Sequence, residues 1–369
     1  MARSRRVLLL VALLSCLSIG VAVGASQRYV LPGDNVFPEG IASQASTGDF
    51  YVGSTTSGTI YRGNVASSVV EAFLPGGVDG RTDVRGLKVG NGRLYLAGGP
   101  TAQLFVYDIA SKKLLGKFAT GLTPSFVNDV TIAPNGDAYF TDSNSPAIYR
   151  VAADVTAANA FARWIDLAGS PIVYAQGFNL IAIAASADGK YLVTVQSNTG
   201  KLFRIDIGTK QVAEIATGGE PLLGGDGLLL DGQTLWVMRN AVATLVTLRL
   251  TPDFGSATIV SADKDADFDF PTTFAQVGNN LLVVNSQLNK RTANQPPTLP
   301  FTVVSIAAPG IVPSPPTTGS GGNLPGLPNT GAGGMGGILP QLLAIGGGLI
   351  VLFAIGGMTR RSRRGSLDR

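Results

Sequence analysis

Apolar and polar residues alternate in short runs over most of the chain, and turn dipeptides separate the runs. The clearest stretch holds four such runs, at residues 87–89, 93–97, 103–108 and 113–118, with Asn91–Gly92 between the first two. A period of two indicates strands that bury one face. Asn-Gly suits a tight hairpin because both residues tolerate positive φ. The stretch therefore predicts four consecutive strands.

This four-strand unit recurs along the chain. Six short apolar runs open on corresponding residues, and the steps between them are 46, 43, 51, 47 and 46 residues. The opening residues are Glu39, Arg85, Asn128, Asn179, Asp226 and Thr272. A period in the forties with several short strands per unit is typical of β-propeller blades. Uneven steps argue against a tightly stacked β-solenoid, and closing the ring removes exposed sheet edges. We predict an all-β, six-bladed β-propeller over residues 26–309.

Two further features of this body agree with that fold. Asn-Gly or Asp-Gly recurs at 135–136, 188–189 and 231–232, where hairpin turns are expected. No stretch shows a convincing apolar helix stripe with caps. The longest step leaves room for a loop over one face at about residues 164–178.

Composition excludes several kinds of chemistry. The chain has no histidine, which rules out a histidine-containing triad and histidine-ligated zinc. Its single cysteine, Cys16, lies in the leader, so the body has no disulfide and no thiol nucleophile. Eight of the 28 basic residues and one of the 24 acidic residues lie in the two terminal segments, which leaves 20 basic and 23 acidic residues in the body. A body with a net charge of −3 is not expected to bind nucleic acid.

The N-terminal segment predicts a secretory signal peptide at residues 1–25. Arginines precede an apolar run over 7–23, and small residues follow at 22–24. Residues 13–16 also resemble a lipoprotein box ending in Cys16, but the apolar run continues past it. An ordinary signal peptide is therefore favoured over lipidation of Cys16.

The C-terminal segment predicts a surface anchor. A Pro/Gly/Ser-rich stalk at 310–326 precedes a pentapeptide that resembles the LPxTG sorting signal of Gram-positive cell-wall proteins. Its residues are Leu327, Pro328, Asn329, Thr330 and Gly331. An apolar segment and an arginine cluster follow within 332–369, as such a signal requires. The resemblance implies cleavage by sortase after Thr330 and linkage to peptidoglycan. The alternative is a protein that stays membrane-anchored with the same topology.

Four of the residues that open the repeats offer oxygen ligands. Glu39 and Asp226 carry carboxylates, and Asn128 and Asn179 carry carboxamides. Equivalent positions of successive blades converge on a central channel, so these residues predict one divalent cation site. Oxygen ligands without histidine or cysteine favour Ca²⁺, then Mg²⁺ or Mn²⁺. The alternative is that the Asn and Asp side chains only stabilise turns at strand starts.

The same segments resemble the senescence marker protein/gluconolactonase/luciferin-regenerating family. The matching sequences are Phe-Pro-Glu-Gly at 37–40, Val-Asn-Asp at 127–129, Asn179 ahead of Ala-Asp-Gly-Lys at 187–190, and Gly-Asp-Gly at 225–227. The family's six-bladed propellers hold one divalent ion in the channel, and many are Ca²⁺-dependent lactonases. The resemblance implies metal ligation by Glu39, Asn128, Asn179 and Asp226. It also implies that Asp226 is the general base for an attacking water.

One departure from the family changes the expected substrate. Sugar-lactone hydrolases of this family place an arginine two residues before the asparagine that is Asn128 here, whereas this chain has Phe126. We expect apolar lactones rather than sugar lactones, with Phe126, Arg85 and Asp129 as candidate substrate-binding residues. Arg85 has an alternative role as the partner of Asp83 or Asp129.

Two functions remain open from the sequence. The first is a secreted, cell-surface, Ca²⁺-dependent hydrolase of lactones or related esters, which acts on a small molecule as a monomer on the outer face of a Gram-positive-type bacterium. The second is a non-catalytic propeller that uses a structural metal ion and binds a ligand, glycan or protein.

Overall fold

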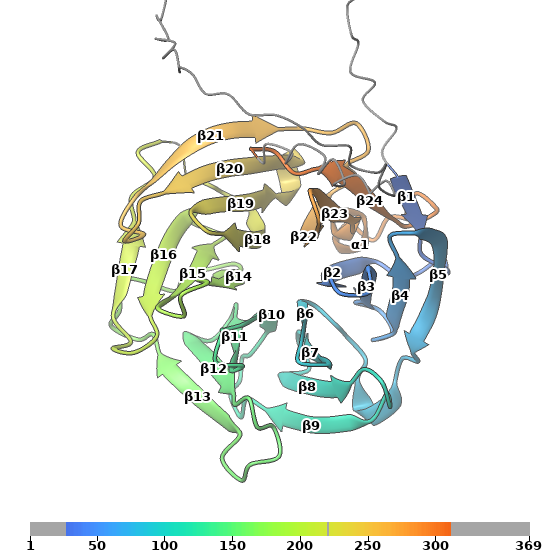
Figure 1. Cartoon of the computed structure of the whole chain (residues 1–369), viewed down its shortest axis with the longest axis horizontal. Coiled ribbons are helices and arrows are strands. Elements are labelled where there is room, and N and C mark those ends of the chain that lie inside the picture. Colours follow the sequence, from blue (N-terminus) through green and yellow to red (C-terminus); the bar gives the residue numbers. More distant parts are fainter. Residues whose placement is uncertain (1–26, 220, 311–369) are drawn as a thin grey trace, which may run out of the picture. The chain divides into compact units, whose positions relative to one another are not determined.

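The computed structural model describes residues 27–219 and 221–310, and these residues form the predicted six-bladed β-propeller (Figure 1). Six four-stranded antiparallel sheets surround a central channel. The predicted signal peptide, sorting motif and apolar span lie outside the described residues, as does the stalk beyond residue 310.

Each of the first five blades uses four consecutive strands, as the sequence predicts. Blade one contains β2 (Pro38–Gln44), β3 (Asp49–Ser54), β4 (Ile60–Asn64) and β5 (Ser67–Leu74). Blade two contains β6 (Leu87–Gly90), β7 (Arg93–Ala97), β8 (Gln103–Asp108) and β9 (Leu114–Ala119). Blade three contains β10 (Val127–Ile132), β11 (Ala138–Asp142), β12 (Ala147–Val151) and β13 (Phe161–Asp166). Blade four contains β14 (Leu180–Ala185), β15 (Tyr191–Gln196), β16 (Lys201–Asp206) and β17 (Val212–Ile215). Blade five contains β18 (Gly225–Asp231), β19 (Thr234–Arg239), β20 (Thr244–Leu250) and β21 (Ala257–Asp263).

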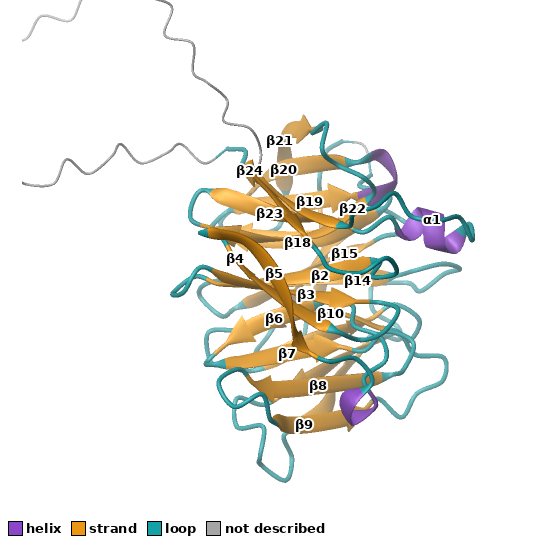
Figure 2. Cartoon of the chain, turned by 90° about the vertical axis from the view of Figure 1, so that its right-hand side faces the viewer, coloured by secondary structure: helices purple, strands orange, loops and turns teal. Residues whose placement is uncertain are grey.

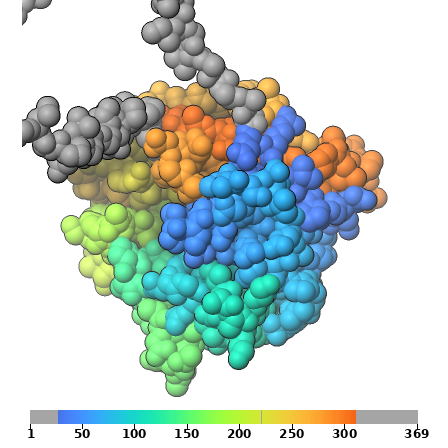
Figure 3. Space-filling model, turned by 45° about the vertical axis from the view of Figure 1, so that its right-hand side comes forward, coloured from blue at the N-terminus to red at the C-terminus, as the bar shows by residue number. Residues whose placement is uncertain are grey.

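Blade six joins the two ends of the described chain. It contains β22 (Pro271–Val277), β23 (Asn280–Asn285), β24 (Thr302–Ala307) and β1 (Gln27–Val30). β1 is its outermost strand and pairs antiparallel with β24, with Gln27 opposite Ser305. Figure 3 shows the N-terminal residues, in blue, against the C-terminal residues, in orange. This pairing closes the ring, because the first described strand completes the blade that the last three strands begin.

Hydrophobic clusters between neighbouring blades form the core. Six buried clusters each combine side chains of two adjacent blades, such as Val193 and Val195 of blade four with Leu228 and Leu235 of blade five. Buried aromatic side chains occupy the second strands of several blades. These are Tyr51, Tyr95, Tyr139 and Trp236. Because the apolar packing lies between the blades, the axis is available for polar side chains.

The predicted hairpin turn in blade two has the expected backbone. Both central residues have positive φ, 51° at Asn91 and 72° at Gly92. At the turn of blade three, Gly136 has a φ of 88°, whereas Asn135 is not among the residues of positive φ. Glycine alone supplies the left-handed conformation there.

The innermost strands are irregular near their starts. In five blades the pairing with the second strand breaks after the first residue and resumes three residues later, at Ile41, Val130, Ile183, Leu228 and Phe274. A bulge of this kind redirects the side chain that it contains. The second residue of these strands therefore occupies one equivalent place around the channel.

The described residues contain little helix. α1 (Leu288–Thr292) lies in the β23–β24 connection, and two 3-10 turns span Val78–Gly80 (η1) and Asn240–Val242 (η2). Figure 2 shows α1 projecting beyond the strand ends on one face of the propeller. Within residues 27–219 and 221–310, no helix has the length and apolar character needed to cross a membrane.

Candidate functional site in the central channel

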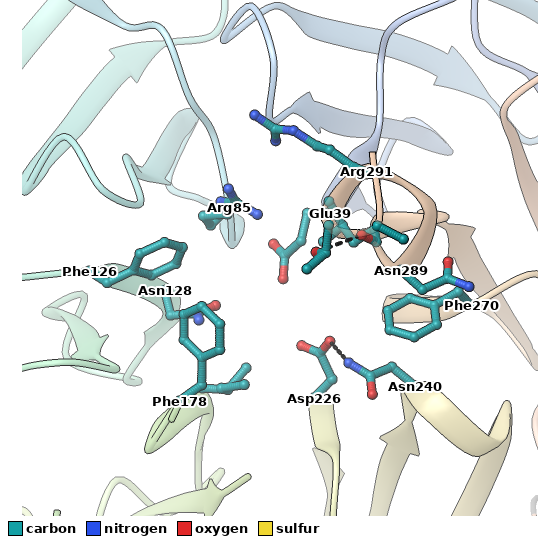
Figure 4. Close-up of a pocket in the computed structure, with 14 residues that line it drawn as sticks. Glu39, Arg85, Phe126, Asn128, Phe178, Asp226, Asn240, Phe270, Asn289 and Arg291 are labelled. Atoms are coloured by element: carbon teal, nitrogen blue, oxygen red, sulfur yellow. Dashed lines mark hydrogen bonds between the residues drawn. The ribbon is translucent and has the colours of Figure 1, made fainter. Parts of the chain in front are cut away.

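A cavity of about 740 Å³ opens at the end of the channel where the innermost strands begin, which we call the upper end. Its walls come from all six blades and from α1, and Figure 4 shows several of their side chains. The lining residues are Glu39, Arg85, Phe126, Asn128, Phe178, Ile181, Asp226, Asn240, Phe270, Leu288, Asn289, Arg291, Thr292 and Ala293. The volume suits a small molecule.

Two carboxylates face each other across the cavity. Glu39 is the second residue of β2 and Asp226 the second residue of β18, and both are 4% exposed. Figure 4 shows the two carboxyl groups pointing toward one another. Oε2 of Glu39 and Oδ1 of Asp226 are buried and have no hydrogen-bond partner among the described residues. Two unpaired carboxylate oxygens in one polar cavity are costly to bury, unless a cation or protons neutralise them.

The electrostatics of the pair follow from this burial. Burial, followed by the charge of Asp226, raises the pKa of Glu39 well above its ordinary value. Burial also raises the pKa of Asp226 to about 7, against a hydrogen bond from Asn240 that lowers it. Nδ2 of Asn240 donates to Oδ2 of Asp226 at 2.8 Å, which leaves Oδ1 without a partner among the described residues and Oδ2 with a further lone pair. Without a cation, the site disfavours two negative charges at neutral pH.

Asn128 presents a carboxamide to the same cavity. It is the second residue of β10, and its Nδ2 donates to Oγ of Ser143 at 2.9 Å. The Ser143 hydroxyl in turn donates to the carbonyl oxygen of Leu180 at 2.7 Å. Because these bonds fix the amide nitrogen, Oδ1 is the atom of Asn128 available to a cation. The predicted convergence of Glu39, Asn128 and Asp226 is therefore observed.

Asn179 does not occupy the position in blade four that corresponds to Glu39, Asn128 and Asp226 in their blades. The predicted register of the repeat is therefore wrong in blade four. β14 begins at Leu180, so its second residue is Ile181, and Ile181 lines the cavity. Oδ1 of Asn179 instead accepts hydrogen bonds from the Ala175 nitrogen at 2.9 Å, and from Gln196 and Asn198 at 3.0 Å each. The shift of two residues keeps the same strand face, so a period-two pattern cannot reveal it. An apolar side chain takes the place of the fourth predicted ligand.

Arg85 has the partner that its alternative role predicted, and it also lines the cavity. Its Nε lies 2.8 Å from Oδ1 of Asp83, and its Nη2 donates to Oδ2 at 2.9 Å. The guanidinium carbon lies 5.0 Å from the ring centre of Phe126. A cation over an aromatic face in this range is stabilising. Arg85 is therefore held rigidly in the wall.

Aromatic side chains form two sides of the cavity. Phe126 packs edge-on against Phe178, with ring centres 5.1 Å apart. Phe270 lies across the cavity from this pair (Figure 4). Phe178 belongs to the connection between blades three and four, where a loop over one face is predicted. Trp164, at the start of that predicted loop, lies instead within strand β13.

Asp129 lies outside the lining of this cavity, so its candidate contact with the substrate is not supported. It sits deeper, in a narrow part of the channel that Gly86 and Lys88 also line. Its Oδ2 accepts a hydrogen bond from the Ile183 nitrogen at 3.1 Å. Burial raises the pKa of Asp129 to about 6, and the charge of Lys88 opposes this. Asp129 links two innermost strands below the site.

Several residues that line the cavity were not predicted from the sequence. They lie in connections between strands, which the repeat does not cover. Asn240 belongs to η2, and Arg291 to α1. Phe270 precedes β22 with a φ of 49°, a conformation that few non-glycine residues adopt.

Among the described residues, no group of three or more acidic, histidine or cysteine side chains could hold a metal ion. Of the predicted ligands, the carboxylates of Glu39 and Asp226 and the carboxamide of Asn128 line the cavity.

No family model and no curated protein matches the chain. Solved structures match at the level of fold. A calcium-binding protein, regucalcin from Agrobacterium tumefaciens, aligns with a TM-score of 0.55 and 16% identity over 76% of this chain and 94% of its own. Virginiamycin B lyase from Staphylococcus aureus, in a catalytically inactive histidine-to-alanine variant with quinupristin, aligns with a TM-score of 0.53 and 15% identity over 70% and 81%. The major allergen Mala s 1 of Malassezia sympodialis aligns with a TM-score of 0.57 and 14% identity over 75% and 95%.

Proposed function

We propose that the upper cavity binds one divalent cation, Ca²⁺ in preference to Mg²⁺ or Mn²⁺, and hydrolyses lactones or related esters there. The observation that carries this proposal is the pair of buried carboxylate oxygens on Glu39 and Asp226, which line one cavity and have no hydrogen-bond partner within residues 27–219 and 221–310. Likeness to a calcium-binding propeller supports it only through the shared fold.

The residues of the cavity fit a hard cation. Glu39 and Asp226 would each supply one carboxylate oxygen, and Asn128 would supply its Oδ1. Three protein oxygens leave coordination positions for water and for a substrate oxygen, which suits the six to eight ligands that Ca²⁺ takes. When bound, the cation would polarise a carbonyl group and offset negative charge.

The chain's own residues account for the remaining requirements of hydrolysis. Asp226, oriented by Asn240, is the general base that takes a proton from the attacking water as the water oxygen bonds to the carbonyl carbon. It returns that proton to the leaving alkoxide oxygen as the acyl C–O bond breaks. Phe126, Phe178 and Phe270 surround an apolar substrate and exclude excess water. The aromatic walls offer contact area and no hydrogen bonds to sugar hydroxyls, which favours flat, apolar lactones.

The lyase neighbour makes a different chemistry less suitable for this chain. Its variant without one histidine is described as catalytically inactive, whereas this chain has no histidine. Carboxylate and cation chemistry is therefore the catalytic route that the available side chains support.

A non-catalytic binding propeller is the second candidate, and Ile181 favours it. An apolar side chain in place of the fourth predicted ligand leaves a smaller set of protein oxygens around the cation. In this alternative the cation stabilises the inner strands, and the aromatic cavity only binds a small molecule.

Activity with and without chelator separates the two candidates. The purified protein should hydrolyse aryl lactones or aryl esters in excess Ca²⁺, and a chelator should abolish turnover. If the protein binds Ca²⁺ tightly but hydrolyses none of a broad panel of lactones and esters, the binding propeller replaces the hydrolase.

We also propose that the protein is displayed on the cell wall through Thr330. The support is the ordered pentapeptide, apolar segment and arginine cluster in the sequence. Wall fractions should release the protein only after digestion of peptidoglycan. Release by detergent alone would indicate a membrane-anchored protein instead.

A further inference from the structure

The connection between β23 and β24 builds one wall of the upper cavity. Residues 286–301 form this connection and include α1. The connection contributes Leu288, Asn289, Arg291, Thr292 and Ala293 to the lining. Hydrogen bonds between residues of this connection fix its conformation. Nζ of Lys290 donates to Oγ1 of Thr298 at 2.6 Å and to Oε1 of Gln287 at 2.8 Å. The wall is therefore a built part of the site.

Arg291 is held at the mouth of the cavity by blade one. Its Nη1 donates to the carbonyl oxygen of Thr55 at 3.0 Å and to Oγ1 of Thr55 at 2.6 Å. Thr55 is itself buried and donates its hydroxyl to the carbonyl oxygen of Phe37 at 2.7 Å. In Figure 4 the guanidinium of Arg291 extends toward the side of the cavity that holds Arg85. One guanidinium nitrogen is thus anchored on blade one, while the residue lines the cavity.

Within residues 27–219 and 221–310, Arg291 forms no ion pair, whereas Arg85 pairs with Asp83. Burial, followed by the charge of Arg85, lowers the pKa of Arg291, and the charge of Asp83 opposes this. An anion bound between the two guanidinium groups would relieve their repulsion. Guanidinium groups recognise carboxylates through paired N–H donors.

The net charge of the site also favours a ligand that carries one negative charge. Glu39, Asp226 and Asp83 carry three negative charges when ionised, and the two arginines carry two positive charges. A bound divalent cation changes the net charge from −1 to +1. One anionic group on the ligand then brings the site to neutrality.

We propose that the upper cavity recognises a flat, apolar molecule that carries one carboxylate, with the carboxylate on Arg291 and the flat body between the phenylalanines. This inference rests on the proposed function, because it names the substrate class for the same cavity. Arg291 is the specificity-determining residue, and Arg85 contributes to the positive field. The substrates would be aryl lactones or esters with an acidic substituent rather than neutral ones.

Calorimetry with a matched pair of probes tests this assignment without requiring turnover. We would titrate 2-naphthoate and its neutral counterpart 2-naphthamide into the full chain in saturating Ca²⁺. We expect 2-naphthoate to bind at least about tenfold more tightly. Arg291→Gln should remove this preference and leave the affinity for 2-naphthamide unchanged. Arg249→Gln is the control, because Arg249 is an exposed residue of β20 outside the cavity.

A separate Ca²⁺ titration shows whether a negative result concerns the anion site at Arg291 or the proposed cation site. Arg291→Gln should keep the affinity for Ca²⁺ and the thermal midpoint in excess Ca²⁺, which rules out misfolding as the cause. Equal affinity of the wild-type protein for the two probes, with Ca²⁺ binding intact, would overturn the anion site. Loss of preference in Arg249→Gln would also overturn it. Absence of Ca²⁺ binding with a retained preference for 2-naphthoate would overturn the metal assignment alone.

Discussion

The two ends of the central channel are built from the same inner strands but satisfy their polar atoms differently. At the lower end, where those strands finish, a cavity of about 230 Å³ is lined by Ser43, Lys88, Thr131 and Gln276 among others. The Ser43 hydroxyl donates to the Gln276 carbonyl oxygen at 2.8 Å, and Thr131 Oγ1 accepts from the Ala185 nitrogen at 3.1 Å. At the upper end, Glu39 and Asp226 each keep a buried oxygen that has no hydrogen-bond partner in the described part of the chain.

The two ends therefore differ in stability, because the upper end buries carboxylate oxygens without hydrogen-bond partners among the described residues. Buried polar atoms without partners destabilise a protein, and they persist where a ligand supplies the missing interaction. At the lower end, Ser43 and Thr131 form hydrogen bonds with neighbouring inner strands. The upper end adds bulges, long connections and α1 to the same repeat. We therefore assign function to the upper end.

The largest expected effect comes from removing a carboxylate at the upper end. Asp226→Asn keeps the size and one oxygen but loses the general base and a negative charge. Hydrolysis of aryl lactones should fall about a hundredfold or more, while the thermal midpoint in excess Ca²⁺ changes little. Ser43→Ala at the lower end is the matched control and should keep full activity. Equal losses of activity in both variants would contradict the assignment of function to the upper end alone.

The pH dependence of stability should differ with and without Ca²⁺. The pKa of Asp226 is about 7 in the fold and 3.8 otherwise, so the folded state binds this proton more tightly. The resulting stabilisation is complete below pH 3.8 and is lost as the pH rises through 7. In chelator, the free energy of unfolding should fall by about 2–4 kcal/mol from pH 5 to pH 8. Saturating Ca²⁺ should reverse this trend.

Urea unfolding of the wild-type protein and of Asp226→Asn measures this difference. The variant should show a shallower pH dependence in chelator, and the remaining slope should reflect Glu39 and Asp129, whose pKa values are also raised. A wild-type protein that becomes more stable in chelator as the pH rises would contradict the proposed burial of like charges.

Blade four allows a test of which position belongs to the site. Ile181→Asn would add an amide oxygen at the fourth equivalent position, and we expect Ca²⁺ to bind about tenfold more tightly. Asn179→Ala should instead leave three donors without their acceptor and lower stability by about 1–3 kcal/mol. Calorimetry and unfolding on both variants check this, with Ile181→Val as the control for packing. Loss of Ca²⁺ affinity in Asn179→Ala alone would restore the original prediction.

Phe126 should have the smallest effect, on substrate preference. Phe126→Ala removes the ring that contacts Phe178 and Arg85, so KM for aryl lactones should rise about threefold to tenfold with little change in kcat. The wild-type protein should prefer aryl lactones to sugar lactones. A preference for sugar lactones would show that the aromatic wall does not contact the substrate.

The repeat made the fold predictable, because each blade carries its own pattern of strands and turns. Glu39, Asn128 and Asp226 were predictable because each is the second residue of an inner strand. Asn179 was misplaced because a shift of two residues preserves strand alternation, and only the bulge shows that Ile181 is equivalent. Asn240 and Arg291 lie in irregular connections, where no period marks a residue as part of the channel.

Calcium titration by calorimetry tests the central claim most directly. The wild-type protein and Ser43→Ala should each bind one Ca²⁺ with the same affinity, and Asp226→Ala should lose that binding. Unchanged Ca²⁺ binding in Asp226→Ala, or no binding by the wild-type protein, would contradict the assignment of a cation site to the upper end.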